Sequence, residues 1–176
     1  MPANLELKAR CADLDAARAR AQGIATAWLG PDEQIDTYFR TASGRLKLRE
    51  SSLSGAQLIP YLRPDQVAAR RSDYVVIPVP EPARTKQLLA ELLGVHRVVR
   101  KTREIALYQN VRIHLDRVDG LGSFVEFEAL WDGAPAGEAE QRAKLDFLRE
   151  RLAIHDADLV ATSYEALLTE PKLEES

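Results

Sequence analysis

The chain has 176 residues, a mass of 19.6 kDa and a formal net charge of −3 at pH 7. Its 45% of hydrophobic and 29% of charged residues exclude an intrinsically disordered chain, and the length predicts a single domain, residues 1–176. The net charge excludes a surface-wide basic field for nucleic acid or an anionic membrane, so a site for an anion must be local.

The apolar stretches are too short for a membrane span. The longest covers about residues 74–79 and is broken by Pro78, whereas a membrane helix needs ~20 apolar residues. Charged residues among the first ten leave no apolar core for a signal peptide. The single cysteine, Cys11, fits a reducing compartment, and we therefore expect a cytoplasmic protein.

The first half of the chain combines short strands with one helix. Polar and apolar residues alternate over 4–10, which predicts a strand, and the alanine-rich segment 13–23 predicts a helix. A Gly-Pro-Asp run at 30–32 is typical of a turn, and the two arginines at 70–71 are interpreted as part of a solvated connection. Further strands are predicted at 34–40, 45–50, 58–63 and 74–79.

The second half places helices on either side of three strands. Leucines at helical spacing predict a helix over 82–93, which Gly94 ends, and a leucine stripe near 145–152 predicts a longer one. Ser163 is positioned to cap a last short helix, after which the chain ends in an acidic tail, residues 170–176. The remaining strands are predicted at 98–108, 111–116 and 124–128.

At least five of these strands carry charged side chains on one face and apolar side chains on the other. A solvated face of an antiparallel sheet explains such alternation, and from the alternation alone it is the more common explanation. Here the sign of the charge is also sorted by strand. The bases are Lys8, Lys47, Arg49, Arg63, Lys101 and Arg103, and the acids are Glu6, Asp116, Glu126 and Glu128.

If the sheet curls so that these faces point inward, like charges crowd together unless a polyanion and a cation enter. Arginine and lysine bind phosphate oxygens, and several carboxylates together hold a hard cation such as Mg²⁺ or Mn²⁺. The pattern therefore favours a site for a polyphosphate and a divalent metal as the functional alternative to a solvated face.

An ordered set of motifs runs along the chain. It begins with Asn4-Leu5-Glu6-Leu7-Lys8 and continues with Asp36-Thr37-Tyr38-Phe39, Leu46-Lys47-Leu48-Arg49-Glu50, Tyr61-Leu62-Arg63-Pro64, Lys101-Thr102-Arg103, His114-Leu115-Asp116, Gly120-Leu121-Gly122 and Phe124-Val125-Glu126-Phe127-Glu128. Over about residues 3–168 this set resembles the CYTH superfamily, the triphosphate tunnel metalloenzymes, which include class IV adenylyl cyclases and thiamine triphosphatases. The family opens with Glu-x-Glu-x-Lys, so Asn4 stands in place of its first acid.

The resemblance implies an α+β fold, an eight-stranded antiparallel β-barrel with flanking α-helices, whose tunnel holds a triphosphate. It implies metal binding by Glu6, Asp116, Glu126 and Glu128, with Glu126, Asp116 and Lys8 as catalytic residues. The implied phosphate-binding residues are Lys8, Lys47, Arg49, Arg63, Lys101 and Arg103. Arg112 is a weaker candidate, because alternation places it on the same strand face as His114.

The expected function is that of a metal-dependent enzyme, using Mg²⁺ or Mn²⁺, that acts on inorganic triphosphate, ATP or thiamine triphosphate. Attack by water gives a triphosphatase, and attack by a ribose hydroxyl gives an adenylyl cyclase, and the residues leave both open. A non-catalytic barrel that binds polyphosphate or a nucleotide is the alternative, which Asn4 keeps open. An RNA 5′-triphosphatase is disfavoured by the net charge, and a monomer and a homodimer are both open.

Overall fold

One antiparallel sheet forms the body of the protein. The computed structural model describes residues 3–61, 70–72 and 75–169. In these residues the strands are β1 (Ala3–Arg10), β2 (Ala27–Phe39), β3 (Arg45–Ser51), β4 (Gly55–Tyr61), β5 (Arg70–Ser72), β6 (Ile77–Pro78), β7 (Val95–Tyr108), β8 (Val111–Val118) and β9 (Gly122–Trp131). Their order across the sheet is β5-β1-β9-β8-β7-β2-β3-β4-β6, and every pairing is antiparallel.

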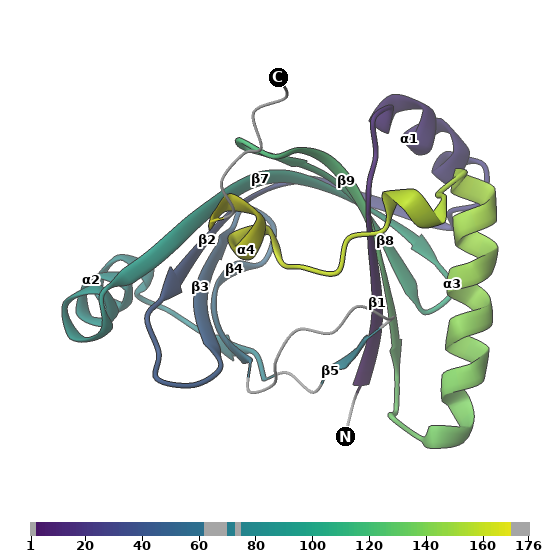
Figure 1. Ribbon diagram of the computed structural model, residues 1–176. Helices are drawn as coiled ribbons and strands as arrows, with labels where there is room; N and C mark the ends of the chain where they lie inside the picture. Colours follow the sequence, from purple (N-terminus) through teal and green to yellow (C-terminus); the bar gives the residue numbers. More distant parts are fainter. Residues whose placement is uncertain (1–2, 62–69, 73–74, 170–176) are drawn as a thin grey trace.

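The sheet curls around a central space to form an incomplete barrel (Figure 1). This confirms the predicted fold class, a curled antiparallel sheet with flanking helices. In the described residues the sheet has nine strands instead of the predicted eight, because residues 70–72, which were expected within a connection, form a short strand. Their backbone pairs with the outer edge of β1, with Arg70 opposite Glu6 and Ser72 opposite Asn4.

The turn predicted at residues 30–32 is also wrong, because β2 continues through this segment. Its pairing with β7 shifts register between Leu29 and Asp32, which is a β-bulge. Gly30 has a φ of 110°, and a Cβ atom there would lie 3.1 Å from the carbonyl oxygen of Arg103. Glycine and proline are tolerated at a bulge, where the regular ladder is interrupted, so the run bends β2 without ending it.

Helices α1 (Leu14–Gln22) and α3 (Glu138–Leu152) cover the outer face of β1, β8 and β9 (Figure 1). Both were predicted, and the Asp13 side chain caps α1 by accepting from the amide of Ala16 at 2.9 Å. Leucines 145, 148 and 152 of α3 pack with Leu14 of α1 against outward side chains of the sheet. This packing buries the main hydrophobic core outside the barrel, so the barrel interior is left to polar side chains.

The remaining helices lie at other places on the sheet. Helix α2 (Pro82–Leu93) lies at one end of β7, and Gly94 ends it with a φ of 77°, as predicted. The short 3-10 helices are η1 (Pro135–Gly137) and η2 (Asp156–Asp158). No helix in the described part of the chain is long and apolar enough to cross a membrane.

The C-terminal segment returns to the sheet and borders its concave side. Val160 donates its amide to the carbonyl of Lys8 at 2.9 Å, and Leu159 forms an isolated bridge with Ala9. Helix α4 (Tyr164–Thr169) follows, and the Ser163 hydroxyl caps it as predicted, accepting from the amide of Ala166 at 3.3 Å. Tyr164 is thereby buried in a second small core with Phe124.

Candidate functional site

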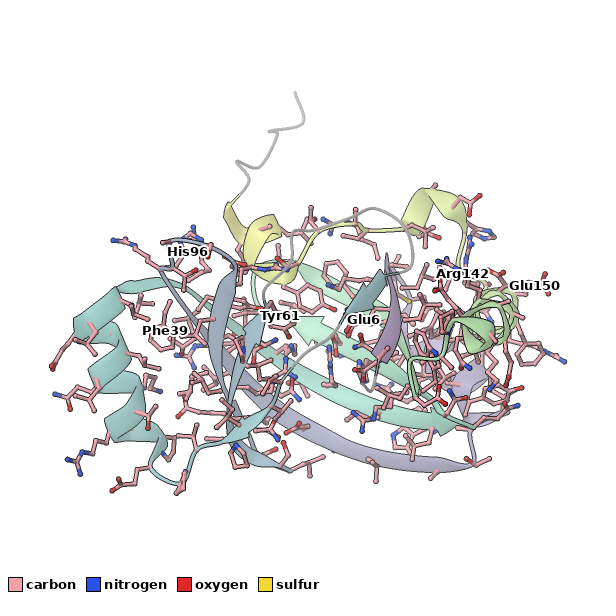
Figure 2. The ribbon with its side chains drawn as sticks, turned by 90° about the horizontal axis from the view of Figure 1, so that it is seen from below. Glu6, Phe39, Tyr61, His96, Arg142 and Glu150 are labelled. Atoms are coloured by element: carbon pink, nitrogen blue, oxygen red, sulfur yellow. The ribbon has the colours of Figure 1, made fainter. Side chains whose placement is uncertain are left out.

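The concave side of the sheet encloses a cavity of about 550 Å³. The lining is mostly polar because side chains alternate between the two faces of each strand. Leu5, for example, packs in the hydrophobic core outside the barrel, whereas Glu6 points into the cavity. Figure 2 shows Glu6 and Tyr61 in the central part of the molecule, whereas Arg142 and Glu150 lie on the outer helix α3. The predicted site residues that line the cavity are Glu6, Lys8, Lys47, Arg49, Lys101, Arg103, Arg112, Glu126 and Glu128.

Two predicted site residues are not among those lining the cavity. Arg63 lies outside the described residues. Asp116 is fully buried beside the cavity, with Arg103 in front of it.

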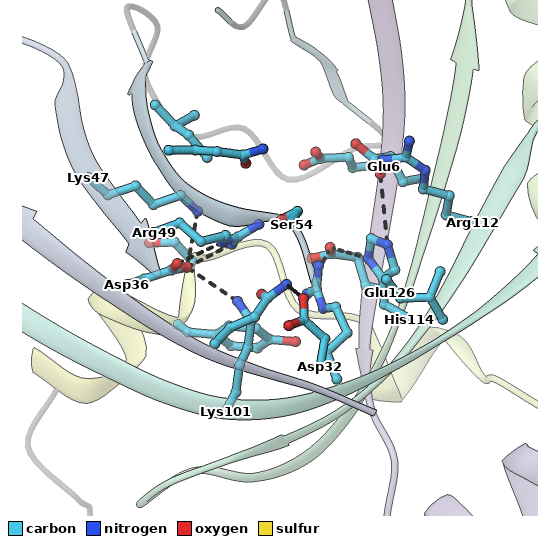
Figure 3. Close-up of a pocket in the computed structure, with 18 of the residues that line it drawn as sticks. Glu6, Asp32, Asp36, Lys47, Arg49, Ser54, Lys101, Arg112, His114 and Glu126 are labelled. Carbon is cyan, nitrogen blue, oxygen red and sulfur yellow. Dashed lines mark hydrogen bonds and ion pairs between the residues drawn. The ribbon is translucent and has the colours of Figure 1, made fainter. Parts of the chain in front are cut away.

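Four bases of β3 and β7 line the cavity, and we call them the basic wall: Lys47, Arg49, Lys101 and Arg103. Figure 3 shows Lys47, Arg49 and Lys101 around Asp36. Three of these bases meet on Asp36 of β2. Arg49 donates from Nε and Nη2 to the two Asp36 oxygens at 2.7 Å each, and Lys47 and Lys101 donate to Oδ2 at 3.2 and 3.3 Å. Burial alone would raise the pKa of Asp36, but Arg49, Lys101 and Lys47 hold it well below its usual range.

The carboxylate of Asp36 does not fully offset the effect of burial on the charge of Lys101. Burial lowers the pKa of Lys101 to about 7, the charges of Arg49 and Arg103 act in the same direction, and Asp36 opposes them. Near neutral pH the basic wall therefore contains an amine that is ready to take up a proton when an anion enters.

Asp116 and Tyr164 hold Arg103 in place. Arg103 donates from Nε and Nη2 to the two Asp116 oxygens at 2.7 and 2.6 Å, and the Tyr164 hydroxyl donates to Oδ2 at 2.7 Å. Lys8 lies 4.3 Å from the centre of the Tyr164 ring, and Lys101 lies 5.4 Å from it. Tyr164 thus contacts or supports three predicted phosphate-binding side chains.

The opposite side, which we call the acidic wall, consists of Glu6, Glu126 and Glu128 from β1 and β9. Lys8 Nζ lies 3.5 Å from Glu126 Oε2, and Arg112 Nη1 lies 3.5 Å from Glu128 Oε2. Burial alone would raise the pKa of Glu126, but Arg103, Lys8 and the hydrogen bond from His114 hold it well below its usual range. Glu126 is therefore an ionised acceptor at neutral pH.

His114 of β8 joins the acidic wall as a neutral hydrogen-bond donor. Its Nδ1 lies 3.0 Å from Glu126 Oε1, and its Nε2 lies 3.8 Å from Glu128 Oε2. Burial, and then the charge of Arg103, lower the pKa of His114, so the neutral ring donates Nδ1–H to Glu126.

Asn4, which stands in place of the first acid of the motif that the sequence resembles, bridges the acidic wall. Its side chain is fully buried, and Nδ2 donates to Glu6 at 2.7 Å and to Glu128 at 3.1 Å. Burial, followed by the charges of Glu126 and Glu128, raises the pKa of Glu6 to about 7. The amide therefore relieves only part of the repulsion among these carboxylates.

The donor chemistry of the acidic wall fits a divalent cation. Three carboxylates supply the oxygen ligands that Mg²⁺ and Mn²⁺ prefer, and the raised pKa of Glu6 reflects negative charge that a cation would offset. Among the described residues, no three His, Cys, Asp or Glu side chains already converge on one point. Glu6, Glu126 and Glu128 would therefore have to exchange some of their present partners to hold the ion.

Sequence reasoning assigned no role to Asp36 or Tyr164. Asp36 belongs to one of the motifs that resemble the family, but it was given no role there. Two features indicate that it faces the cavity: it lies two residues before Tyr38 on the same strand face, and the hairpin pairs it with Arg49. Tyr164 had no usable signal, because only the packing of the C-terminal segment on Phe124 brings it to the cavity.

Comparison with known proteins places the chain in a family. Protein PH1012 of Pyrococcus horikoshii is 23% identical, with a TM-score of 0.81 over 93% of this chain and 98% of that chain. A Vibrio parahaemolyticus protein provisionally described as an adenylate cyclase is also 23% identical, with a TM-score of 0.76 over 95% of this chain and 98% of that chain. No curated protein matched the chain. These likenesses show the shared fold, and the sequence matches the CYTH domain over residues 3–164; the chain therefore belongs to the CYTH domain family.

Proposed function

We propose that the protein is a metal-dependent enzyme that acts on a small-molecule triphosphate held in the cavity. The observation that carries this proposal is the pairing of a basic wall with an acidic wall across one cavity of about 550 Å³ (Figure 3). Enzymes of the CYTH family typically act on triphosphates and generally depend on divalent metals. A phosphate chain needs both walls, the bases for its oxygens and the acids for its cation.

The basic wall is organised before the substrate arrives. Asp36 holds Arg49, Lys47 and Lys101, and Asp116 holds Arg103, so these groups lose little conformational freedom on binding. Phosphate oxygens then share the donors that the two aspartates leave available. Positioning and charge neutralisation are the main contributions a protein makes to phosphoryl transfer.

Glu126 is our candidate for the residue that orients the attacking oxygen. It is ionised at neutral pH and can accept a hydrogen bond from a water or a hydroxyl group. Lys8, which lies 3.5 Å from Glu126, is placed to neutralise charge that develops on the phosphate chain. A divalent cation bound by Glu6, Glu126 and Glu128 would supply further neutralisation of phosphate charge.

Phosphorus NMR of the reaction products tests the proposal. The protein is incubated with Mg²⁺ or Mn²⁺ and, separately, with inorganic triphosphate, ATP and thiamine triphosphate. Orthophosphate identifies a triphosphatase, and pyrophosphate with cyclic AMP identifies a cyclase, the activity suggested by the Vibrio parahaemolyticus neighbour. Glu126→Gln should abolish turnover, whereas Glu104→Gln, outside the cavity, should not.

A non-catalytic binding barrel is the second candidate, and the position of Asn4 favours it. Asn4 replaces the first acid of the family pattern, which lowers the negative charge available for a cation by one unit, and its amide already cross-links Glu6 and Glu128. Binding of triphosphate without turnover under any metal would support this candidate. The cytoplasmic location, the single domain, and the choice between monomer and homodimer stay predictions of the sequence.

A further inference from the structure

One end of the cavity carries exposed apolar side chains. Leu29 is 48% exposed and Leu53 is 55% exposed, and both line the cavity. They come from β2 and from the turn between β3 and β4. Apolar side chains that converge from separate elements on a charged cavity indicate a ligand with an apolar part.

Strand pairing places these side chains at the same end, which we call the turn end because the β3–β4 turn forms it. The amide of Leu53 donates to Asp32, which follows Leu29 across the bulge of β2. Ile105 of β7, directly opposite Leu29, adds a third apolar side chain to the lining at this end.

The turn end also holds a hydrogen-bond acceptor that the described residues leave unsatisfied. Gln34 lines the cavity, is only 5% exposed, and donates its Nε2 to Asp32 at 2.6 Å. This bond fixes the amide, and its Oε1 has no hydrogen-bond partner among the residues the structure describes. A buried acceptor without a donor costs stability, which a ligand N–H or O–H at this position would recover.

The other end of the cavity, beside α4, is less suited to an organic ring. Its aromatic side chains already have cations against their faces. Lys8 lies over Tyr164 at 4.3 Å, and Tyr61 has Lys47 at 5.2 Å and Arg45 at 5.6 Å. The cations beside these rings suit this end to phosphate.

We propose that the turn end is a subsite for the organic part of an organic triphosphate, a ring that rests on Leu29 and Leu53 and donates a hydrogen bond to Gln34. Inorganic triphosphate has no apolar surface and no reason to require these side chains. The inference rests on the proposed function, because the phosphate chain is what places the organic group here.

The test compares the affinities of ATP, thiamine triphosphate and inorganic triphosphate, measured by calorimetry with Ca²⁺ in place of Mg²⁺ to slow turnover. The variants are the double substitution Leu29→Ser with Leu53→Ser, and Gln34→Met. Leu92→Ser is the matched control, because Leu92 is 78% exposed on α2 and does not line the cavity. The substituted leucines are half-exposed, so the variants are expected to fold.

We expect at least one organic triphosphate to bind the native protein more tightly than inorganic triphosphate does. The double variant should weaken that binding about tenfold and leave the affinity for inorganic triphosphate unchanged, as expected for loss of apolar contact. Equal losses for both ligands, or no preference in the native protein, would overturn the subsite and leave the proposed function standing. Failure of the native protein to bind inorganic triphosphate would overturn the proposed function and the subsite with it.

Discussion

Arg49 and Asp36 form a two-pronged ion pair inside the cavity, with both nitrogen–oxygen distances at 2.7 Å. Asp36 is the shared counter-ion of Arg49, Lys47 and Lys101. The protein therefore neutralises part of its phosphate-binding charge before any ligand enters, and it keeps the bases in one arrangement.

Replacing Asp36 should destabilise the folded protein, because the buried bases lose their shared counter-ion. We expect Asp36→Asn to lower the free energy of unfolding by about 3–5 kcal/mol, the range for breaking a buried ion pair. Inorganic triphosphate should stabilise the variant more than the native protein, because the polyanion replaces the lost charge. Urea denaturation with and without triphosphate measures both effects. Asp15→Asn, on the exposed surface, is the control, and a loss no larger than in that control would contradict the role of Asp36.

Lys101 should make stability depend on pH above neutrality. Its pKa is lowered to about 7 in the folded protein, whereas an unfolded lysine titrates near ~10.4. Between these values the unfolded chain binds the extra proton, so the free energy of unfolding rises with pH. We expect the native protein to gain about 2 kcal/mol relative to Lys101→Met between pH 7 and pH 9. Chemical denaturation at both pH values checks this, and parallel pH profiles would refute the lowered pKa.

Tyr164→Phe removes the hydroxyl group and keeps the ring, so it tests the contribution of the hydroxyl group alone. The ring remains beside Lys8 and Lys101, but Asp116 loses a buried donor and Arg103 loses support. We expect triphosphate to bind about 3–10-fold more weakly, the effect of about 1 kcal/mol, because the lost hydrogen bond acts on the ligand only through Arg103. Calorimetry measures the affinity. Tyr108→Phe is the control, since Tyr108 stacks on Phe147 away from the cavity, and equal affinities in the two variants would contradict this role for Tyr164.

Asn4→Glu should restore the acid of the family pattern. Without metal we expect lower thermal stability, because the amide bridge between Glu6 and Glu128 becomes a fourth negative charge. Added Mn²⁺ should raise the melting temperature of the variant by more than that of the native protein. Gln87→Glu, next to Glu91 on α2, adds a carboxylate pair outside the cavity as a control. The same Mn²⁺ response in all three proteins would show that Asn4 does not face the cation.

Alternation made the two faces of the strands predictable. Leu5 and Glu6 were assigned to opposite faces, and the structure places Leu5 in the outer core and Glu6 in the cavity. Helix ends were predictable for the same local reason, since Asp13 and Gly94 act on their own neighbours.

Features that depend on distant partners were not predictable. The Gly-Pro-Asp run at 30–32 is typical of a turn, and only its pairing with β7 on both sides makes it a bulge. Asp116 shares a strand face with His114, yet it does not line the cavity. The long Arg103 side chain, which pairs with Asp116, lines the cavity in its place. Tyr164 reaches the site because the C-terminal segment packs back onto the sheet, and no local sequence pattern predicts that packing.

The measurement that tests the central claim most directly is the affinity of inorganic triphosphate, with Mg²⁺ present, for the native protein, Arg49→Met and Arg18→Met. Arg49 belongs to the basic wall, whereas Arg18 pairs with Glu104 outside the cavity. We predict tight binding by the native protein and Arg18→Met, and a loss of at least about tenfold in Arg49→Met, the weight of a charge-assisted hydrogen bond. No binding to the native protein, or equal affinities in all three, would contradict the assignment of this cavity to a triphosphate.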